Sequence, residues 1–121
     1  MSRPVTVYAE MTPNPATIKF VADVMLINNG ESVEFLSKEE CKDHSKFADA
    51  LFNFPFVSGV FISGNFVTVT KSAAIEWNYV MQSLREFIHE WIADNEIIVE
   101  KIPELRAFSV SDEKGTELVS E

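Results

Sequence analysis

The sequence predicts an α+β two-layer sandwich, in which helices cover one face of an antiparallel sheet in the order β-β-α-β-β-α. Two pairs of segments, 5–10 with 16–21 and 57–63 with 66–71, alternate apolar and polar residues around short turn sequences. This period of two is typical of half-buried strands. The stretch 74–94 instead repeats apolar residues at intervals of three and four, which indicates a long amphipathic helix. Two hairpins and such a helix bury their apolar faces against each other, which gives two layers.

A proline-rich connection closes the first hairpin. Thr12 and Asn14 each precede a proline, Pro13 or Pro15, and a residue before proline avoids the helical region. We therefore expect a rigid loop between the first two strands. A weaker strand is expected over 32–36, after an Asn-Asn-Gly turn sequence.

Capping signals divide the middle of the chain into two helical pieces. Ser37 begins a capping-box pattern with a glutamate three residues later. The sequence 43–45, Asp-His-Ser, offers a second N-cap and predicts an interruption before a compact helix at 46–53, which ends ahead of Pro55. For the long C-terminal helix, Ser72 is the expected N-cap.

The two-residue turn Gly64-Asn65 sets the register of the second hairpin. Counted outward from it, the predicted pairs are Ile62 with Val67, Val60 with Val69, and Phe61 with Thr68. One face of this hairpin is then wholly aliphatic, and we expect it to pack in the core against the long helix. The predicted core residues are Val7, Ile18, Phe20, Val60, Ile62, Val67 and Val69 from the sheet, and Leu51, Trp77, Val80, Met81, Leu84, Phe87 and Ile88 from the helices.

The sheet face away from the helices has no strong element left to cover it. It combines aromatic and polar side chains, namely Thr6, Tyr8, Thr17, Lys19, Phe61, Phe66, Thr68 and Thr70. An exposed apolar patch with a polar rim is typical of interaction sites. Alternatively, the C-terminal tail folds back over it through Ile97, Ile98, Val99, Ile102, Leu105 and Phe108, and both interpretations stay open. The candidate partner-binding residues are Tyr8, Thr12, Pro13, Asn14, Pro15, Lys19, Phe61 and Thr68.

Composition bounds the classes of function. The 121 residues carry a formal charge of -9, which is the wrong sign for non-specific nucleic-acid binding. No apolar run is long enough for a membrane span, and no secretory signal is visible. The single cysteine fits a reducing compartment, so we expect a cytoplasmic protein. We divide the chain into a domain over 1–96 and an acidic, solvated tail over 97–121.

Few residues in this sequence suit catalysis or metal binding. Cys41 and His44 stand three apart, but tetrahedral zinc needs three or four protein ligands and no second pair is present. His89 and Glu86 are three apart on the long helix without matching sets elsewhere. We expect no catalytic residue, metal site or cofactor. Cys41 is expected in a first helical turn, where the helix dipole lowers the pKa of a thiol.

Two sequence blocks carry a resemblance to a known family. The first is Thr12-Pro13-Asn14-Pro15-Ala16-Thr17-Ile18-Lys19-Phe20. The second, followed by Trp77, is Val57-Ser58-Gly59-Val60-Phe61-Ile62-Ser63-Gly64-Asn65-Phe66-Val67-Thr68-Val69-Thr70-Lys71. From about Val5 to Asn95 the chain resembles the N-terminal domain of Nfu/NifU-like iron-sulfur scaffold proteins. The resemblance implies a compact α/β domain and a role in building or delivering iron-sulfur clusters.

The family's cluster ligands have no counterpart in this sequence. In full-length family members a separate C-terminal domain holds the cluster through a Cys-x-x-Cys pair, and Cys41 alone cannot supply four thiolates, even in a dimer. The resemblance therefore implies a non-enzymatic, protein-binding accessory in iron-sulfur or iron handling, which docks a scaffold or recipient protein. The alternative is a small thiol-dependent enzyme or redox protein built around Cys41 and His44.

Overall fold

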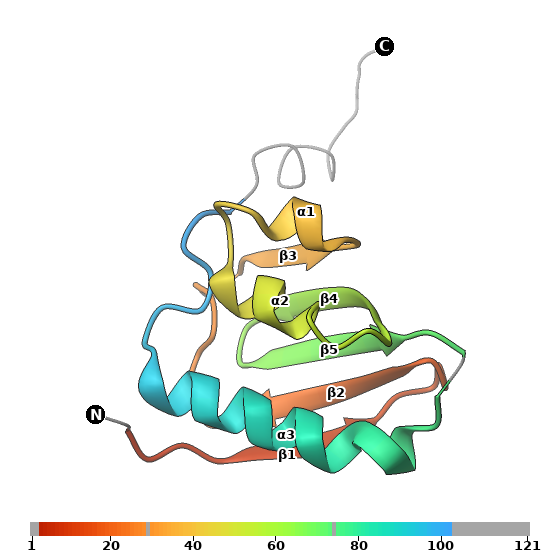
Figure 1. Ribbon diagram of the computed structural model, residues 1–121. Helices are drawn as coiled ribbons and strands as arrows, with labels where there is room; N and C mark the ends of the chain where they lie inside the picture. Colours follow the sequence, from red (N-terminus) through yellow and green to blue (C-terminus); the bar gives the residue numbers. More distant parts are fainter. Residues whose placement is uncertain (1–2, 29, 74, 103–121) are drawn as a thin grey trace.

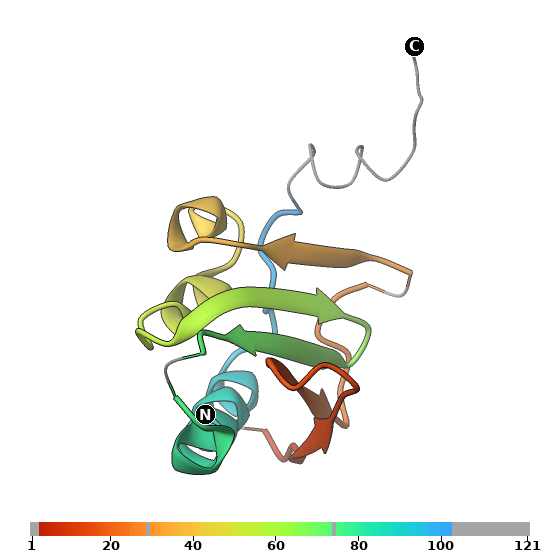
Figure 2. The same cartoon turned by 90° about the vertical axis from the view of Figure 1, so that its right-hand side faces the viewer.

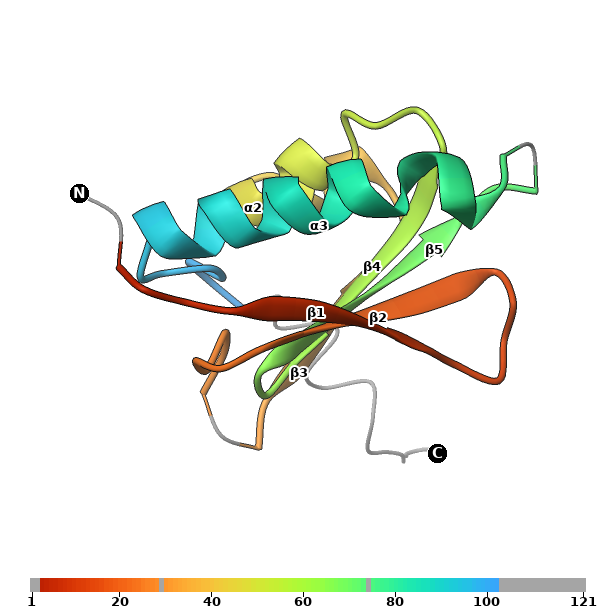
Figure 3. The same cartoon turned by 90° about the horizontal axis from the view of Figure 1, so that it is seen from below.

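A computed structural model of the chain describes residues 3–28, 30–73 and 75–102. Its elements are, in order, β1 (Val7–Met11), β2 (Thr17–Ala22), β3 (Ser32–Phe35), α1 (Lys38–Cys41), α2 (Lys46–Leu51), β4 (Val57–Ser63), β5 (Phe66–Lys71) and α3 (Trp77–Asp94). The strands form one antiparallel sheet in the order β1-β2-β5-β4-β3. The helices lie on one face of this sheet (Figures 1 and 3). The predicted α+β two-layer sandwich is confirmed.

The central hairpin has the register that its turn predicts. Val60 pairs with Val69, Phe61 with Thr68 and Ile62 with Val67. Gly64 in the turn has a φ of 55°, a left-handed conformation that favours glycine. The weak strand is also present, since β3 pairs with β4 at one edge of the sheet.

The connection from β2 to β3 crosses the end of the central hairpin. The Leu26 backbone N–H donates to the Gly64 carbonyl at 2.8 Å, and the Asn65 side-chain amide donates to the Ala22 carbonyl at 2.8 Å. Leu26 and Ile27 bury their side chains on the way. These bonds carry the chain across β5 and β4, so that β3 completes the far edge.

The two predicted capping serines begin α1 and α2. Ser37 Oγ accepts from the Glu40 N–H at 3.3 Å, and Ser45 Oγ accepts from the Ala48 N–H at 3.1 Å. Between the helices the backbone reverses at Asp43, whose φ is 67°. The predicted interruption is confirmed, and α2 ends at Leu51, two residues earlier than predicted.

The predicted N-cap of the long helix is wrong. α3 begins at Trp77 with Glu76 as its N-cap, and Glu76 makes no side-chain capping hydrogen bond. The Ser72 N–H instead donates to the Phe56 carbonyl at 2.8 Å. This bond ties Ser72 to the segment before β4, and Ser72 lies four residues ahead of Glu76.

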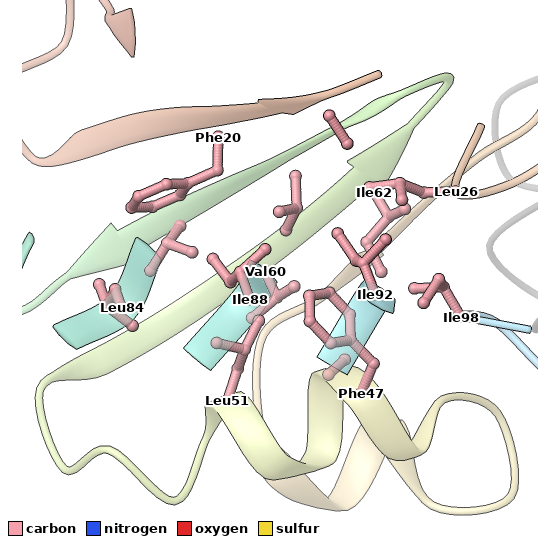
Figure 4. Packing of buried hydrophobic residues seen from close by; sticks show 14 of the residues in the cluster. Phe20, Leu26, Phe47, Leu51, Val60, Ile62, Leu84, Ile88, Ile92 and Ile98 are labelled. Carbon is pink, nitrogen blue, oxygen red and sulfur yellow. The ribbon is translucent and has the colours of Figure 1, made fainter. Parts of the chain in front are cut away.

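The core fills the space between the sheet and the helices (Figure 4). Phe20, Val60 and Ile62 from the sheet meet Leu84 and Ile88 from α3, and all five are at most 1% exposed. The predicted core is confirmed, with Val80, Met81 and Phe87 partly buried at its rim.

Side chains from α3 attach the segment that leads into β1. His89 Nε2 lies 3.0 Å from the Val5 carbonyl oxygen, and Arg85 Nη1 donates to the Val7 carbonyl at 3.5 Å. Arg3 extends this attachment, because its Nε donates to the Ile92 carbonyl at 3.1 Å. These bonds give His89 a structural role next to an edge strand.

Candidate functional site

Alternate residues of all five strands form a face directed away from the helices. We call it the open face, and its side chains are Tyr8 and Glu10 from β1, Thr17, Lys19 and Val21 from β2, Phe66, Thr68 and Thr70 from β5, Phe61 and Ser63 from β4, and Ser32 and Glu34 from β3. Each is exposed or partly exposed, whereas the alternate residues are mostly buried in the core. None of the described helices covers this face, as Figures 2 and 3 show from two directions.

Lys19 lies near the middle of the open face and is held by two neighbours. Its Nζ is 3.6 Å from Glu10 Oε1 and 4.2 Å from the centre of the Phe66 ring. The Phe66 ring in turn lies 6.1 Å from that of Phe61. Ion pair, cation–π contact and ring contact together fix a charged group above an aromatic surface.

An apolar band crosses the open face diagonally. It consists of Tyr8, Val21, Phe66, Phe61 and Leu36, and Tyr8 and Leu36 are each 55% exposed. Leu36 joins the band directly after the end of β3, where it lies beside Gly59. A Cβ at Gly59 would lie 3.7 Å from Leu36 Cδ2. The band ends at both edges of the sheet, where Glu10 and Glu34 stand.

The loop between β1 and β2 is ordered by its own polar groups. Thr12 Oγ1 donates to the Asn14 carbonyl at 2.9 Å, and Asn14 Oδ1 accepts from the Ala16 N–H at 2.9 Å. From the helical layer, Trp77 Nε1 donates to the Pro15 carbonyl at 3.0 Å. Pro13, Asn14 and Pro15 stay exposed at the tip, so the loop is a fixed and accessible feature.

The predicted partner-binding residues form two groups that meet at one end of the sheet. Tyr8, Lys19, Phe61 and Thr68 share the open face. The loop residues Thr12, Pro13, Asn14 and Pro15 lie beyond the strand ends, where Thr12 Oγ1 hydrogen-bonds Thr17 Oγ1. The sequence analysis did not assign Glu34 and Leu36 to the open face. The pairing of Glu34 with Phe61 in the sheet is the observation that places them there.

Residues 97–102 of the predicted tail lie with the helical layer. Ile98 is 1% exposed in the core, and its carbonyl accepts from Ser45 Oγ at 2.8 Å. The N–H groups of Glu100 and Lys101 both donate to the His44 carbonyl. The described tail therefore leaves the open face uncovered, while Leu105 and Phe108 lie outside the described residues.

Cys41 and His44 line one hollow of about 610 Å³ between α1 and α2. The thiol is 1% exposed and donates to the Ser37 carbonyl at 3.5 Å. Burial raises the pKa of Cys41 to about 12, and the nearby Asp49 carboxylate adds to this effect. The expected lowering by a helix dipole is wrong, because Cys41 is the last residue of a four-residue helix. His44 Nδ1 lies 3.0 Å from the Lys101 carbonyl oxygen.

Comparison with known proteins assigns this fold to a family. Residues 7–95 match the family described as scaffold protein Nfu/NifU N terminal. The chain belongs to this family. A NifU-like protein from Saccharomyces cerevisiae has a similar structure, with a TM-score of 0.71 and 25% identity over 80% of this chain and 86% of that one. Protein SAV1430 from Staphylococcus aureus shares the fold at a TM-score of 0.52 and 18% identity, over 69% of this chain and 98% of that one.

Curated relatives of this Nfu/NifU N-terminal domain are longer than the chain. The relative from Drosophila erecta, "NFU1 iron-sulfur cluster scaffold homolog, mitochondrial", is 29% identical over 75% of this chain and 32% of its own length. The protein of the same name from Drosophila ananassae is 26% identical over 95% of this chain and 40% of its own length. The chain thus spans about a third of the length of the relatives that it matches. Their names state a mitochondrial location, and the cytoplasmic location expected here stays a prediction.

Two kinds of feature are absent from the described ranges. There, no set of three or more His, Cys, Asp or Glu side chains is arranged to hold a metal ion. Across the same ranges, no helix combines the length and the apolar character needed to cross a membrane.

Proposed function

We propose that this Nfu-type domain is a non-enzymatic accessory module in iron-sulfur cluster assembly or delivery, which binds a protein partner and does not itself hold the cluster. The partner is a cluster scaffold or a recipient protein. It docks on the open face through Tyr8, Lys19, Phe61 and Thr68, with the loop 12–15 at the rim of the contact.

The apolar band on an uncovered sheet face is the observation that supports this proposal most. Protein interfaces typically have aromatic side chains at their centre and polar groups around them. Lys19 adds specificity, because its position between Glu10 and the Phe66 ring is fixed before a partner arrives. Family membership supports the iron-sulfur context.

The thiol-based alternative has less support. A nucleophilic or metal-binding cysteine works as the thiolate, whereas the pKa of Cys41 is raised to about 12. Its Sγ donates a hydrogen bond to a backbone carbonyl, and His44 is engaged with Lys101. We therefore propose no reaction for this pair.

Site-specific photo-crosslinking tests the docking surface. A benzophenone amino acid replaces Phe61 in the full chain, and crosslinked proteins are identified by mass spectrometry after irradiation in cells. The matched control carries the same group in place of Tyr79, which is 75% exposed on α3. We expect iron-sulfur scaffold or recipient proteins at position 61 and none of them at position 79.

Two substitutions then measure the energetic contribution of the face. Phe61→Ala and Lys19→Glu are each expected to weaken binding of the identified partner by at least about tenfold. Both should lower the free energy of unfolding by less than about 1 kcal/mol, and Tyr79→Ala should leave binding unchanged. Crosslinks from position 61 to the chain's own C-terminal part, or a loss above about 2 kcal/mol for Phe61→Ala, would contradict the proposal.

A further inference from the structure

A second concave surface lies at the end of the molecule where the β2–β3 connection meets the segment after α3. These two segments run along the same side of the molecule in Figure 1. The groove between them has a volume of about 460 Å³, and we call it the acidic groove. Its lining residues are Met25, Leu26, Ile27, Asn28, Glu31, Glu96, Ile97, Ile98, Val99, Glu100 and Ile102. It shares no residue with the open face.

The acidic groove has an apolar floor and an apolar mouth. Leu26 and Ile98 form part of its floor and belong to the core, where they are 4% and 1% exposed (Figure 4). Met25 and Ile97 are 50% and 64% exposed, and both line the groove. Two large aliphatic side chains left in water beside a concave surface favour burial against a partner.

Charge restricts what that partner presents. Glu31, Glu96 and Glu100 line the groove, and among the described residues of its lining there is no lysine, arginine or histidine. Glu100 Oε1 already accepts from the Lys46 N–H at 3.0 Å. Glu31 Oε1 is buried and has no hydrogen-bond partner in the described part of the chain. Three carboxylates along one groove, with no cation among its described lining residues, favour a partner that brings positive charge.

We propose that the acidic groove binds a segment of a partner protein in which lysine or arginine alternates with aliphatic side chains. The cation pairs with Glu31 and Glu96, and the aliphatic groups cover Met25 and Ile97. Arginine fits best, because a guanidinium donates two parallel hydrogen bonds to one carboxylate. A metal ion fits less well, since the described residues provide no group of three or more metal ligands.

A peptide-binding experiment on the full chain tests this proposal. The probe is a short fluorescent peptide of alternating leucine and arginine, compared at about 0.15 M salt with a peptide in which serine replaces leucine. We expect the leucine peptide to bind at least about tenfold more tightly by fluorescence anisotropy. When the leucine peptide is added, the amide chemical shifts of the protein should change mainly at residues 25–28 and 96–102.

Glutamate-to-glutamine variants distinguish binding in the groove from general electrostatic attraction of a cationic peptide to a protein of charge -9. The pair Glu31→Gln with Glu96→Gln should weaken the leucine-arginine peptide about tenfold. The control pair Glu86→Gln with Glu90→Gln removes the same charge from exposed positions on α3 and should change the affinity less than about twofold. Ile97→Ser should lower affinity for the leucine peptide and leave the serine peptide unaffected.

Three outcomes would overturn the proposal. They are equal losses in the two glutamate-to-glutamine pairs, shift changes on the open face in place of the groove, and a lower melting temperature for Glu31→Gln alone. The last result would mean that the Glu31 carboxylate has a favourable partner within the free chain. Because the open-face variants Phe61→Ala and Lys19→Glu leave this groove intact, failure here is distinguishable from failure of the proposed docking function.

Discussion

At the residue scale, burial decides how the single thiol of the chain behaves. With its pKa raised from 9.0 to about 12, Cys41 has a thiolate fraction roughly a thousandfold smaller at pH 8 than a thiol at the ordinary value. We expect iodoacetamide to modify the folded chain far more slowly than the urea-unfolded chain, as followed by mass spectrometry. Similar rates in the two states would contradict the burial of Cys41.

The same pKa shift makes stability depend on alkaline pH. The folded pKa lies above the unfolded value of 9.0, so the folded state keeps the proton longer. This contribution to stability is complete below about pH 9 and is lost as the pH rises toward 12. A Cys41→Ala variant should lose less stability over this interval than the parent in urea unfolding.

Single residues also explain where sequence reasoning failed. The capping rules found Ser37 and Ser45, because each helix start there depends on neighbours three residues away. Ser72 has the right chemistry for an N-cap, but its backbone N–H bonds to Phe56, sixteen positions earlier in the chain. A contact at that separation leaves no local signal.

At the element scale, the loop between β1 and β2 combines rigidity with exposure. Pro13 and Pro15 restrict the unfolded chain, and the folded loop is held by Thr12, Asn14 and Trp77. Replacing both prolines with alanine should lower the free energy of unfolding by about 0.4–1 kcal/mol for each position, measured by urea unfolding.

Partner binding distinguishes a structural loop from a contact surface. If the prolines act by keeping the loop rigid, their replacement should weaken partner binding modestly, in proportion to the loss of order in the loop. A collapse of binding with unchanged stability would show that the proline rings touch the partner directly. Pro55→Ala, in the connection between α2 and β4, is the control that changes an exposed proline at another site.

The hairpins were predictable because their register depends on adjacent residues. The turn at Gly64 fixes the pairing of β4 with β5, and the alternating pattern then assigns one face to the core and the other to solvent. The position of β3 at the far edge depends instead on Leu26 bonding to Gly64 and on Glu34 pairing with Phe61. For this reason the sequence predicted the centre of the open face and missed its β3 edge.

At the scale of the whole molecule, the two candidate surfaces show different degrees of predictability. The open face follows from strand alternation, which is a local pattern. The acidic groove forms between 25–28 and 96–102, segments that are far apart in the sequence and lie together only in the folded chain. Burial of Ile98 also places part of the chain beyond the predicted boundary at 96 in the core, whereas the sequence predicts an acidic, solvated tail from residue 97 onward.

Iron-sulfur reconstitution tests the proposal that the partner holds the cluster and that this chain does not. A cluster needs four protein ligands, commonly thiolates, whereas the 121 residues contain one cysteine and its side chain is 1% exposed. The full chain incubated with iron, sulfide and a reductant should therefore stay colourless after desalting. Mixed with a cluster-loaded scaffold that it binds, it should leave the visible absorbance with the scaffold when the two are separated. An absorbance band on the isolated chain that Cys41→Ser removes would contradict both the accessory role and the buried state of this thiol.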